Sequence, residues 1–458
     1  MHLCRYLVLH RLEHGGWLAI NGLSGAVDLL DDSTREKLEA VATGAGLRCD
    51  PELVARLRQR SYLFDGPEDE ERLLLAMWER HRKRARERPL RFALCPTHGC
   101  NLACRYCFEG EITSKPSPAL GDDAVAAAFH AMERIGAGDP GRKLEVSLFG
   151  GEPLLPSTGR AVRRILQEAE SRGMSVVVVT NGTELASAYG DLLERFRRVF
   201  NHFQVTIDGP PHIHDMRRPF RSGRGSYQAI VDGVDLLLRL GLNVALRVNL
   251  DGHNVRHLPE LAEIIVRRGW AGRNNLRCVL APVADHLGSS GYPDLLPEDA
   301  LVRELADVIA ASEAVRRLFS MDLFRSAQHI GSVLGLTGVK AQPMFRYCEA
   351  NGLNAFTLGA DGYIYPCSEM LGQPELATGT FFPSFEIDET RAAPWRERSI
   401  ISMAGCRSCH VATFCGGGCA YQSLKRCGSP MEPSCYGAEK VISAFLERFG
   451  DRIVPRAT

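Results

Sequence analysis

Residues 94–110 read LCPTHGCNLACRYCFEG, and they carry the densest cluster of reactive side chains in the first half of the chain. Three of the cysteines, Cys100, Cys104 and Cys107, are spaced C-x3-C-x2-C directly after a strand-like run. Three thiolates can hold three irons of a [4Fe–4S] cube and leave the fourth iron open to another ligand. A zinc knuckle is the alternative for this spacing taken alone. Cys95 lies on the strand itself, and we expect it to be a small buried side chain.

Strand-like and helical patterns alternate from residue 90 to about residue 283. The strand candidates are RFALC, LEVSLFGG, SVVVVTNG, HFQVTIDG, NVALRVNL and NLRCVLAP, and helical stretches separate most of them. Such β/α units predict a parallel sheet whose functional side chains lie at the carboxyl ends of the strands. A closed barrel of this type has eight strands, so we expect an α/β fold with an open, partial (β/α)6 barrel.

The residues before this region predict a small α+β unit. RYLVLHRL, GWLAIN and AVDLL are short strand-like runs, and helical patterns follow at 33–43, 51–60 and 68–88. Three strands followed by three helices is the order of a winged helix-turn-helix. Two roles for this unit are a structural cap on the barrel and a DNA-binding winged helix. The DNA-binding role is disfavoured because no basic recognition helix is present.

The residues after the barrel change character. A helical connector is expected first, and beyond it Gly, Pro and Cys dominate a turn-rich segment. Such a segment buries little apolar surface, so metal centres are the expected source of its stability. We therefore divide the chain into five parts. These are a winged-helix-like unit (1–88), a partial barrel (89–283), a helical connector (284–345), a cysteine-rich segment (346–440), and a final helix and tail (441–458).

Whole-chain composition excludes several classes of protein. The 458 residues contain 55 Lys plus Arg and 55 Asp plus Glu, so net charge gives no reason to expect a nucleic-acid or membrane partner. No apolar run approaches the roughly 18 residues of a membrane span, and the beginning does not resemble a signal peptide. We expect a cytoplasmic protein. In that compartment thiols stay reduced, so the 15 cysteines are more readily explained as metal ligands than as disulfides.

The stretch CNLACRYCF resembles the signature of the radical S-adenosylmethionine (SAM) enzymes. The resemblance implies that Cys100, Cys104 and Cys107 hold a [4Fe–4S] cluster whose open iron chelates the methionine part of SAM. In such enzymes the reduced cluster cleaves SAM, and the resulting 5′-deoxyadenosyl radical abstracts hydrogen from the substrate. The resemblance also implies that Tyr106 and Phe108 belong to the segment that contacts adenine.

Other strand ends resemble SAM-binding motifs of the same family. Gly150, Gly151, Glu152 and Pro153 match its GGEP motif, which receives the amino group of SAM. Further candidates follow the third, fourth and fifth strands. By the resemblance, Asn181 and Asp208 lie beside SAM. Arg247 and Asn249 are candidates for contact with its carboxylate and ribose.

The cysteine-rich segment resembles the SPASM extension found behind some radical SAM barrels. Its spacing is C-x9–15-G-x4-C, then C-x2-C-x5-C-x3-C and a distal cysteine, and half a zinc ribbon is the alternative for the C-x2-C pair alone. The resemblance implies two auxiliary [4Fe–4S] clusters, hence three in all. One would be held by Cys406, Cys409, Cys415 and Cys435, and the other by Cys348, Cys367 and Cys419.

Two details of this assignment stay open. Cys427 is a spare thiol or an alternative ligand. Some relatives carry an eighth cysteine just before the first SPASM position, where residues 341–344 here read AQPM. One iron of the three-cysteine cluster is therefore expected to be open unless Cys427 or a noncysteine residue completes it.

SPASM relatives mostly modify peptides or proteins. The resemblance implies an oxidoreductase that abstracts hydrogen from a ribosomally synthesised precursor peptide and forms a thioether, C–C or C–O crosslink. The amino-terminal unit resembles the element that binds the leader of such precursors, and flavodoxin or ferredoxin would supply electrons. The alternatives are an enzyme acting on a folded protein or a small molecule, and a non-enzymatic iron–sulfur or zinc-binding regulator.

The resemblance also bears on the catalytic group. In the sulfatase maturases a catalytic Asp follows the second SPASM cysteine, whereas Ser368 stands there in this sequence. That departure counts against sulfatase maturation. The candidate catalytic residues are Glu369 and Tyr365, which flank Cys367.

Overall fold

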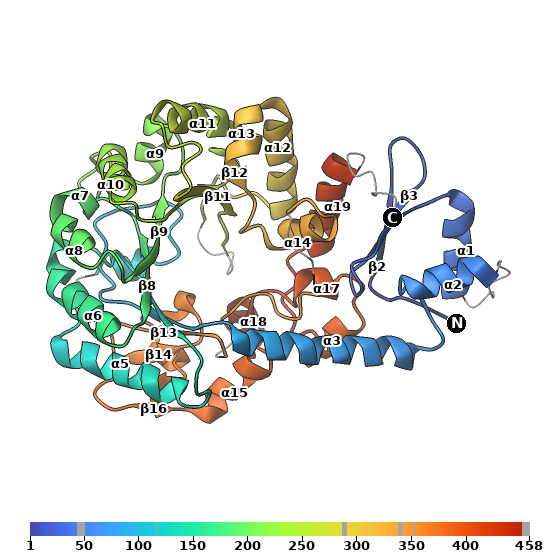
Figure 1. Ribbon diagram of the computed structural model, residues 1–458, viewed down its shortest axis with the longest axis horizontal. Coiled ribbons are helices and arrows are strands. Elements are labelled where there is room, and N and C mark those ends of the chain that lie inside the picture. The colour runs from blue at the N-terminus through green and yellow to red at the C-terminus, as the bar shows by residue number, and fades with distance from the viewer. Residues whose placement is uncertain (44–50, 116, 286–290, 338–341, 351–352, 451–458) are drawn as a thin grey trace.

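The structure is a computed structural model that describes residues 1–43, 51–115, 117–285, 291–337, 342–350 and 353–450 (Figure 1). Its centre is a parallel sheet in which six strands lie in sequence order: β6 (Leu90–Leu94), β7 (Leu144–Leu148), β8 (Ser175–Thr180), β9 (Phe200–Thr206), β10 (Val244–Leu250) and β11 (Leu276–Pro282). These are the six predicted strands. The expected open, partial barrel is confirmed.

Helices between the strands cover the outer face of the sheet (Figure 1). Helix α6 shows why, because Val162, Ile165 and Leu166 recur at helical spacing and are buried against the sheet. The helices of this layer are α5 (Asp122–Gly136), η1 (Pro156–Thr158), α6 (Gly159–Ser171), α7 (Leu185–Ala188), α8 (Gly190–Arg195), α9 (Pro211–Arg217), α10 (Tyr227–Arg239), η2 (Val255–His257) and α11 (Leu258–Arg267), and the short α4 (Gly110–Thr113) precedes them.

The sheet continues beyond the six strands at both ends. The connector was expected to be helical, and it forms α12 (Glu298–Ala311), α13 (Glu313–Leu318) and α14 (Arg325–Val333), but it also adds the parallel strand β12 (Phe319–Ser320) beside β11. At the other end β13 (Ala355–Leu358) pairs in parallel with β6, and an antiparallel meander follows through β14 (Tyr363–Tyr365), β15 (Gly379–Thr380) and β16 (Glu386–Ile387). The cysteine-rich segment therefore begins as a strand of the barrel sheet.

The rest of the cysteine-rich segment consists of short helices joined by turns. These are η3 (Ser368–Met370), η4 (Pro374–Leu376), α15 (Glu389–Glu397), α16 (Ala404–Arg407), α17 (Ala412–Cys415) and α18 (Ala420–Cys427). Helix α19 (Ala438–Phe449) closes the described chain. Of the predicted helix and tail at 441–458, residues 451–458 lie outside the described residues. Within the described part of the chain, none of the helices has the length and apolarity needed to cross a membrane.

The amino-terminal unit contains the predicted order of strands and helices. Strands β2 (Leu7–Arg11), β3 (Trp17–Asn21) and β4 (Val27–Leu30) form an antiparallel sheet with β3 in the middle, and a short pair joins β1 (His2–Leu3) to β5 (Leu63–Phe64). The helices are α1 (Asp32–Ala42), α2 (Pro51–Gln59) and α3 (Pro67–Glu87). Each begins and ends within one residue of the predicted range.

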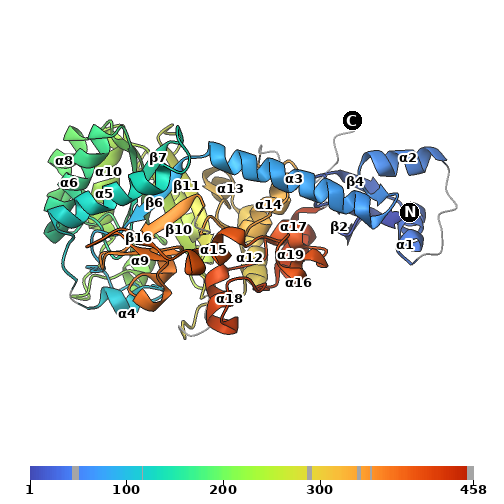
Figure 2. The same cartoon turned by 90° about the horizontal axis from the view of Figure 1, so that it is seen from below.

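Helix α3 connects the amino-terminal unit to the barrel (Figures 1 and 2). Pro67 opens the helix, Glu68, Asp69 and Glu70 follow in its first turn, and its last turn is basic, which suits the helix dipole. Its 21 residues span about 31 Å at 1.5 Å per residue. The basic end therefore lies far from the amino-terminal sheet, beside the start of β6.

An apolar cluster joins the amino-terminal unit to the cysteine-rich segment. Tyr6, Leu23 and Leu74 from the first part are buried together with Ile400 and Met403 from the second. The two parts therefore share a core.

Candidate functional site

The cysteine loop, residues 95–109, runs from the end of β6 to α4 and forms one wall of a cavity of about 1740 Å3. Cys100, Cys104 and Cys107 all line this cavity, and none is in a disulfide. Burial raises the pKa of Cys100 and of Cys107 to about 12. A bound cation is what would keep such buried thiols ionised. Three thiols of one loop at the wall of a cavity fit a three-thiolate iron–sulfur cluster.

Cys95 is separate from these three thiols. Its side chain is fully buried, and its thiol donates a hydrogen bond to the carbonyl of Thr97, with 3.1 Å between sulfur and oxygen. It also fills the space beside Gly150, where a built Cβ would lie 2.2 Å from its sulfur. Cys95 thus occupies the buried position that the sequence predicted.

The GGEP stretch packs directly on the cysteine loop. Gly151 has φ +26°, and a Cβ added there would lie 2.3 Å from the carbonyl oxygen of Gly99. The next amide, of Glu152, donates to that same oxygen at 2.8 Å. Only glycine allows this approach of two backbones. Gly150 and Gly151 line the cavity beside the cysteines.

The carboxylate of Glu152 points away from the cavity. It accepts hydrogen bonds from the Thr180 hydroxyl at 2.6 Å, the Asn181 amide at 2.6 Å and the Leu154 amide at 2.9 Å. The side chain is buried, and it ties the end of β7 to the end of β8. In this arrangement Glu152 fixes the positions of Gly151 and Asn181, which do face the cavity.

Tyr106 is the centre of a buried polar network. Its hydroxyl donates a short hydrogen bond to Asp208 and accepts hydrogen bonds from Arg218 at 2.7 Å and Asn249 at 3.1 Å. Arg217 lies over the Tyr106 ring, 4.9 Å from its centroid. The network joins the cysteine loop to the ends of β9 and β10.

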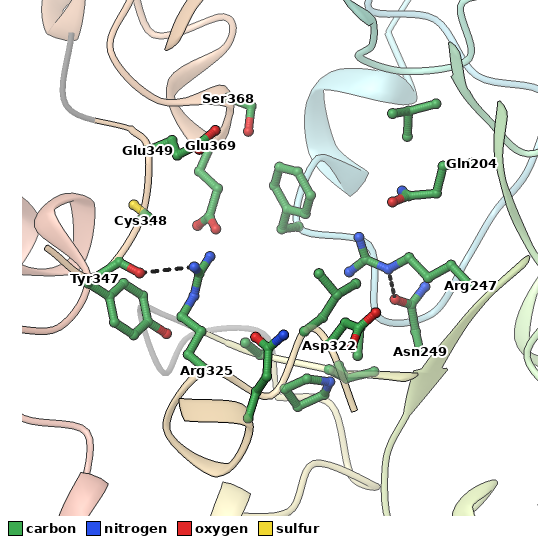
Figure 3. A pocket seen from close by; sticks show the side chains of 18 of the residues that line it. Gln204, Arg247, Asn249, Asp322, Arg325, Tyr347, Cys348, Glu349, Ser368 and Glu369 are labelled. Atoms are coloured by element: carbon green, nitrogen blue, oxygen red, sulfur yellow. Dashed lines mark hydrogen bonds between the residues drawn. The ribbon is translucent and has the colours of Figure 1, made fainter. Parts of the chain in front are cut away.

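The structure divides the predicted SAM-binding residues into two groups. Those that line the cavity are Tyr106, Phe108, Gly150, Gly151, Asn181, Arg247 and Asn249. Glu152, Pro153 and Asp208 are buried or lie behind this wall. Figure 3 shows Arg247 and Asn249 side by side on one wall, with Nε of Arg247 donating to Oδ1 of Asn249 at 2.7 Å.

The cysteines of the cysteine-rich segment gather into two sets. Burial, together with the neighbouring thiols Cys415, Cys409 and Cys435, raises the pKa of Cys406 to about 12. Burial likewise raises the pKa of Cys367, and Cys348 and Cys419 contribute to the rise. The structure thus brings together the same four and the same three cysteines that the resemblance implies. Cys427 is exposed at the end of α18.

Two residues near Cys367 were candidates for catalysis. Tyr365 is fully buried, its hydroxyl donates to Asp361 at 2.7 Å, and it does not line the cavity. Glu369 does line the cavity, as does Ser368, and burial raises the pKa of Glu369 to about 7. The geometry therefore favours Glu369 over Tyr365 as a group that meets a substrate.

Sequence reasoning predicted Arg247 but missed Arg217, Arg218 and Arg325. Arg218 lines the cavity and contacts Tyr106, and Arg217 pairs with buried Asp251. Both follow the strand-end motif at Asp208 within ten residues, which is the signal that could have found them. Arg325 enters the same cavity from α14, far along the chain, and no local pattern marks it.

Comparison with known proteins accounts for this arrangement, because residues 94–265 match the Radical SAM superfamily. Residues 94–265 form a radical SAM domain, as in the radical SAM enzymes. The chain is 23% identical over 341 residues to the cysteine-type anaerobic sulfatase-maturating enzyme of Clostridium novyi, a match that covers 70% of this chain and 84% of that protein. A non-enzymatic iron–sulfur or zinc-binding regulator, the alternative of another class, is therefore not supported.

Two solved structures share the fold of this chain. The anSMEcpe structure with bound AdoMet and Cp18Cys peptide aligns with a TM-score of 0.59 and 18% identity, over 80% of this chain and 98% of that one. SuiB of Streptococcus suis bound to precursor peptide SuiA aligns with a TM-score of 0.56 and 14% identity, over 95% of this chain and 99% of that one. A match over 95% of the chain must include most of the amino-terminal unit.

Proposed function

We propose that this radical SAM enzyme modifies a ribosomally synthesised precursor peptide and forms a crosslink in it. One observation carries the proposal. A single cavity is lined by the three thiols of the cysteine loop, by Cys348 of the cysteine-rich segment, and by Arg84 and Arg88 at the basic end of α3. A peptide held by the amino-terminal unit could follow α3 into this cavity and reach the centre of the barrel.

The cofactors follow from the cysteine sets. Cys100, Cys104 and Cys107 would hold the [4Fe–4S] cluster that binds SAM, and together these groups supply a radical that removes a hydrogen atom from the substrate. The Tyr106 network and the GGEP stretch would orient SAM against that cluster. Arg247 and Asn249, on β10 beside this network, are proposed to contact its carboxylate and ribose.

Two auxiliary clusters complete the proposal. Cys406, Cys409, Cys415 and Cys435 would fill all four positions of one cluster, whereas the set formed by Cys348, Cys367 and Cys419 has three thiols and would leave one iron open. Glu369 stands beside this second set and faces the cavity. We assign it the role of a catalytic group that meets the substrate.

The edge of β4 is the proposed site for the leader of the precursor. β4 pairs only with β3 among the described strands, and Leu29 on it is 51% exposed. The amide of Asn21 donates to the carbonyl of Ala26, and hydrogen-bonded pairs alternate along an antiparallel ladder. The backbone of Leu29, which is opposite Leu18, therefore faces outward, where an added strand would pair with it.

An enzyme that acts on a short segment of a protein substrate is the second candidate. The names of several similar proteins favour it, because the curated relatives include cysteine-type and serine-type sulfatase-maturating enzymes. Ser368, which replaces the catalytic Asp of that family, counts against it. Both candidates place an extended peptide in the cavity.

Anaerobic turnover tests these two candidates. The reconstituted enzyme is incubated with SAM, dithionite and either a precursor peptide encoded beside its gene or a peptide that carries a sulfatase maturation motif. Formation of 5′-deoxyadenosine together with a mass change in the precursor supports the proposal. Leu29→Pro removes the outward amide and should lower modification of the precursor at least tenfold, whereas Leu29→Ala should not. Modification of the sulfatase motif alone, unaffected by Leu29→Pro, would contradict it.

A further inference from the structure

Arg325 projects into the cavity from the first turn of α14 (Figure 3). One guanidinium nitrogen donates a hydrogen bond to the carbonyl of Tyr347 at 2.9 Å. The guanidinium also lies 4.5 Å from the centroid of the Tyr347 ring. These two contacts hold a long side chain in one orientation and lower the entropy that it would lose on binding a ligand.

The charge of Arg325 has no counterion in contact with it. Among the residues that the structure describes, no carboxylate lies within 4.0 Å of its guanidinium, whereas the buried Arg217 pairs with Asp251. Arg325 is exposed although it projects into the interior, because its accessible surface opens into the cavity. A bound ligand that fills the cavity would remove this cation from water, and a buried charge without a partner is costly, so the ligand should carry an opposite charge.

Two carboxylates interact with the charge of Arg325 from a distance. Glu369 and Glu298 both line the cavity, and Figure 3 shows the side chain of Glu369 directed toward Arg325 without a hydrogen bond between them. Space is therefore left around the free edge of the guanidinium. The guanidinium of Arg325 lies between the wall that carries Cys348 and the wall that carries Arg247.

Exposed apolar side chains also line the cavity that Arg325 enters. Phe108 is 55% exposed and Leu323 is 37% exposed, and both line the cavity. Apolar side chains lower the local dielectric and strengthen an ion pair formed next to them. Among the described residues, only the Tyr347 carbonyl is seen to accept a hydrogen bond from this guanidinium, and its remaining donors match the two oxygens of a carboxylate.

We propose that Arg325 binds one carboxylate of the substrate peptide, either an Asp or Glu side chain close to the modified residue or a carboxyl terminus. This inference rests on the proposed peptide substrate. Glu298 and Glu369 would repel a second acidic group, so the site accepts one carboxylate and disfavours an acidic run. Arg325 is then a specificity-determining residue, placed between the two walls of the cavity.

Equilibrium dialysis with small labelled probes tests this assignment on the full-length, anaerobically reconstituted enzyme with SAM. The probes are acetyl-Gly-Glu-Gly-amide, its Gln analogue, acetyl-Gly-Gly-Gly with a free carboxyl terminus, and glutarate. Wild-type enzyme should bind the Glu peptide or the free-terminus peptide at least tenfold more tightly than the Gln peptide, and the stronger of the two identifies the source of the carboxylate. Arg325→Gln should abolish the difference, and Arg325→Lys should retain part of it.

The matched control is Arg303→Gln. Arg303 pairs with Glu447 and Asp299, does not line the cavity, and its replacement should leave the discrimination unchanged. Measurable but equal binding of the Glu, Gln and free-terminus peptides by wild type would overturn the assignment. A second outcome would also overturn it. If Arg325→Gln still distinguishes the probes with a carboxylate from the Gln peptide, but its iron content or the reduction potential of a cluster changes, Arg325 serves the cysteine set near Cys348 instead.

Glutarate separates the failure of this inference from the failure of the proposed function. If glutarate binds in a manner that requires Arg325 and none of the peptides binds, the carboxylate site stands and the peptide substrate is wrong. If neither glutarate nor any peptide binds, the carboxylate site itself is overturned.

Discussion

The hydroxyl of Tyr106 donates a hydrogen bond to Asp208, although the two residues are 102 positions apart in the sequence. Asp208 is fully buried, and its other carboxylate oxygen accepts from the amide of Asn249 at 2.9 Å. One side chain therefore ties the cysteine loop to the ends of two neighbouring strands. Cysteines on a loop need such support, because a cluster and SAM must be held in a fixed relation.

Replacement of Tyr106 by Phe removes this support without removing the ring. The variant leaves Asp208 and Arg218 without their shared hydroxyl, and loss of hydrogen bonds to charged groups costs about 1.5–3 kcal/mol. We expect SAM to bind at least tenfold more weakly while iron content stays near the wild-type level. Titration with SAM under anaerobic conditions measures this. Tyr189→Phe is the control, since its buried hydroxyl donates to Leu155 outside the cavity, and equal SAM affinity in the two variants would contradict the role of Tyr106.

Metal content tests the division of the cysteines into three sets. Three [4Fe–4S] clusters imply about 12 irons per chain. Replacement of Cys100, Cys104 and Cys107 by Ala should remove about a third of the iron and abolish SAM cleavage, and replacement of Cys406, Cys409 and Cys415 should remove a similar share.

Iron analysis and the yield of 5′-deoxyadenosine report on the two sets separately. Cys278→Ala is the control, because this cysteine is buried on β11 apart from the clustered thiols. A preparation dominated by zinc, or cleavage of SAM by the first triple variant, would show that the assignment is wrong.

Local signals were sufficient to predict much of the fold. The acidic start and basic end of α3 and the apolar runs of β7 and β8 belong to short stretches of sequence, so their elements were predicted almost residue by residue. The cysteine spacings were equally local. These features depend on neighbours within one turn or one strand.

Long-range contacts were not predictable in this way. The pairing of β13 with β6 joins residues more than 250 positions apart, and nothing in AFTL or RFALC specifies it. The sequence also could not show that Glu152 points toward Thr180, that Tyr365 is buried against Asp361, or that Arg325 reaches the cavity. The direction of a side chain depends on how distant elements pack.

Gly151 provides a test of backbone proximity. Alanine there would place a Cβ 2.3 Å from the carbonyl oxygen of Gly99, so one of the two loops must move. Overpacking of this kind costs about 1–3 kcal/mol, and we expect Gly151→Ala to weaken SAM binding at least tenfold. Gly110→Ala is a matched control near the same loop, since nothing lies within 4 Å of its Cβ. Equal SAM affinity in both variants would show that the close approach has no role in binding.

The last prediction concerns His214, whose side chain is 0% exposed. Its Nδ1 accepts a hydrogen bond from the amide of Asp208 at 3.2 Å, and its Nε2 lies 3.1 Å from the hydroxyl of Ser226. Burial lowers the pKa of His214 well below its usual range, and Arg218 and Arg217 lower it further. The native state therefore keeps His214 neutral, with Nδ1 unprotonated.

An unfolded histidine takes up a proton below about pH 6.5, whereas native His214 does not. Because the unfolded state then binds one more proton, the free energy of unfolding decreases as the pH falls from about 6.5, and it decreases until the lowered native pKa is reached. A full proton corresponds to about 1.4 kcal/mol per pH unit. His214→Asn can still accept the Asp208 amide but does not titrate, so between pH 6 and pH 5 its free energy of unfolding should fall by about 1 kcal/mol less than that of wild type. Anaerobic denaturant unfolding at several pH values measures the two slopes. His130→Asn, at an exposed position, should keep the wild-type slope, and identical slopes for the His214 variant and wild type would show that His214 is protonated in the native state.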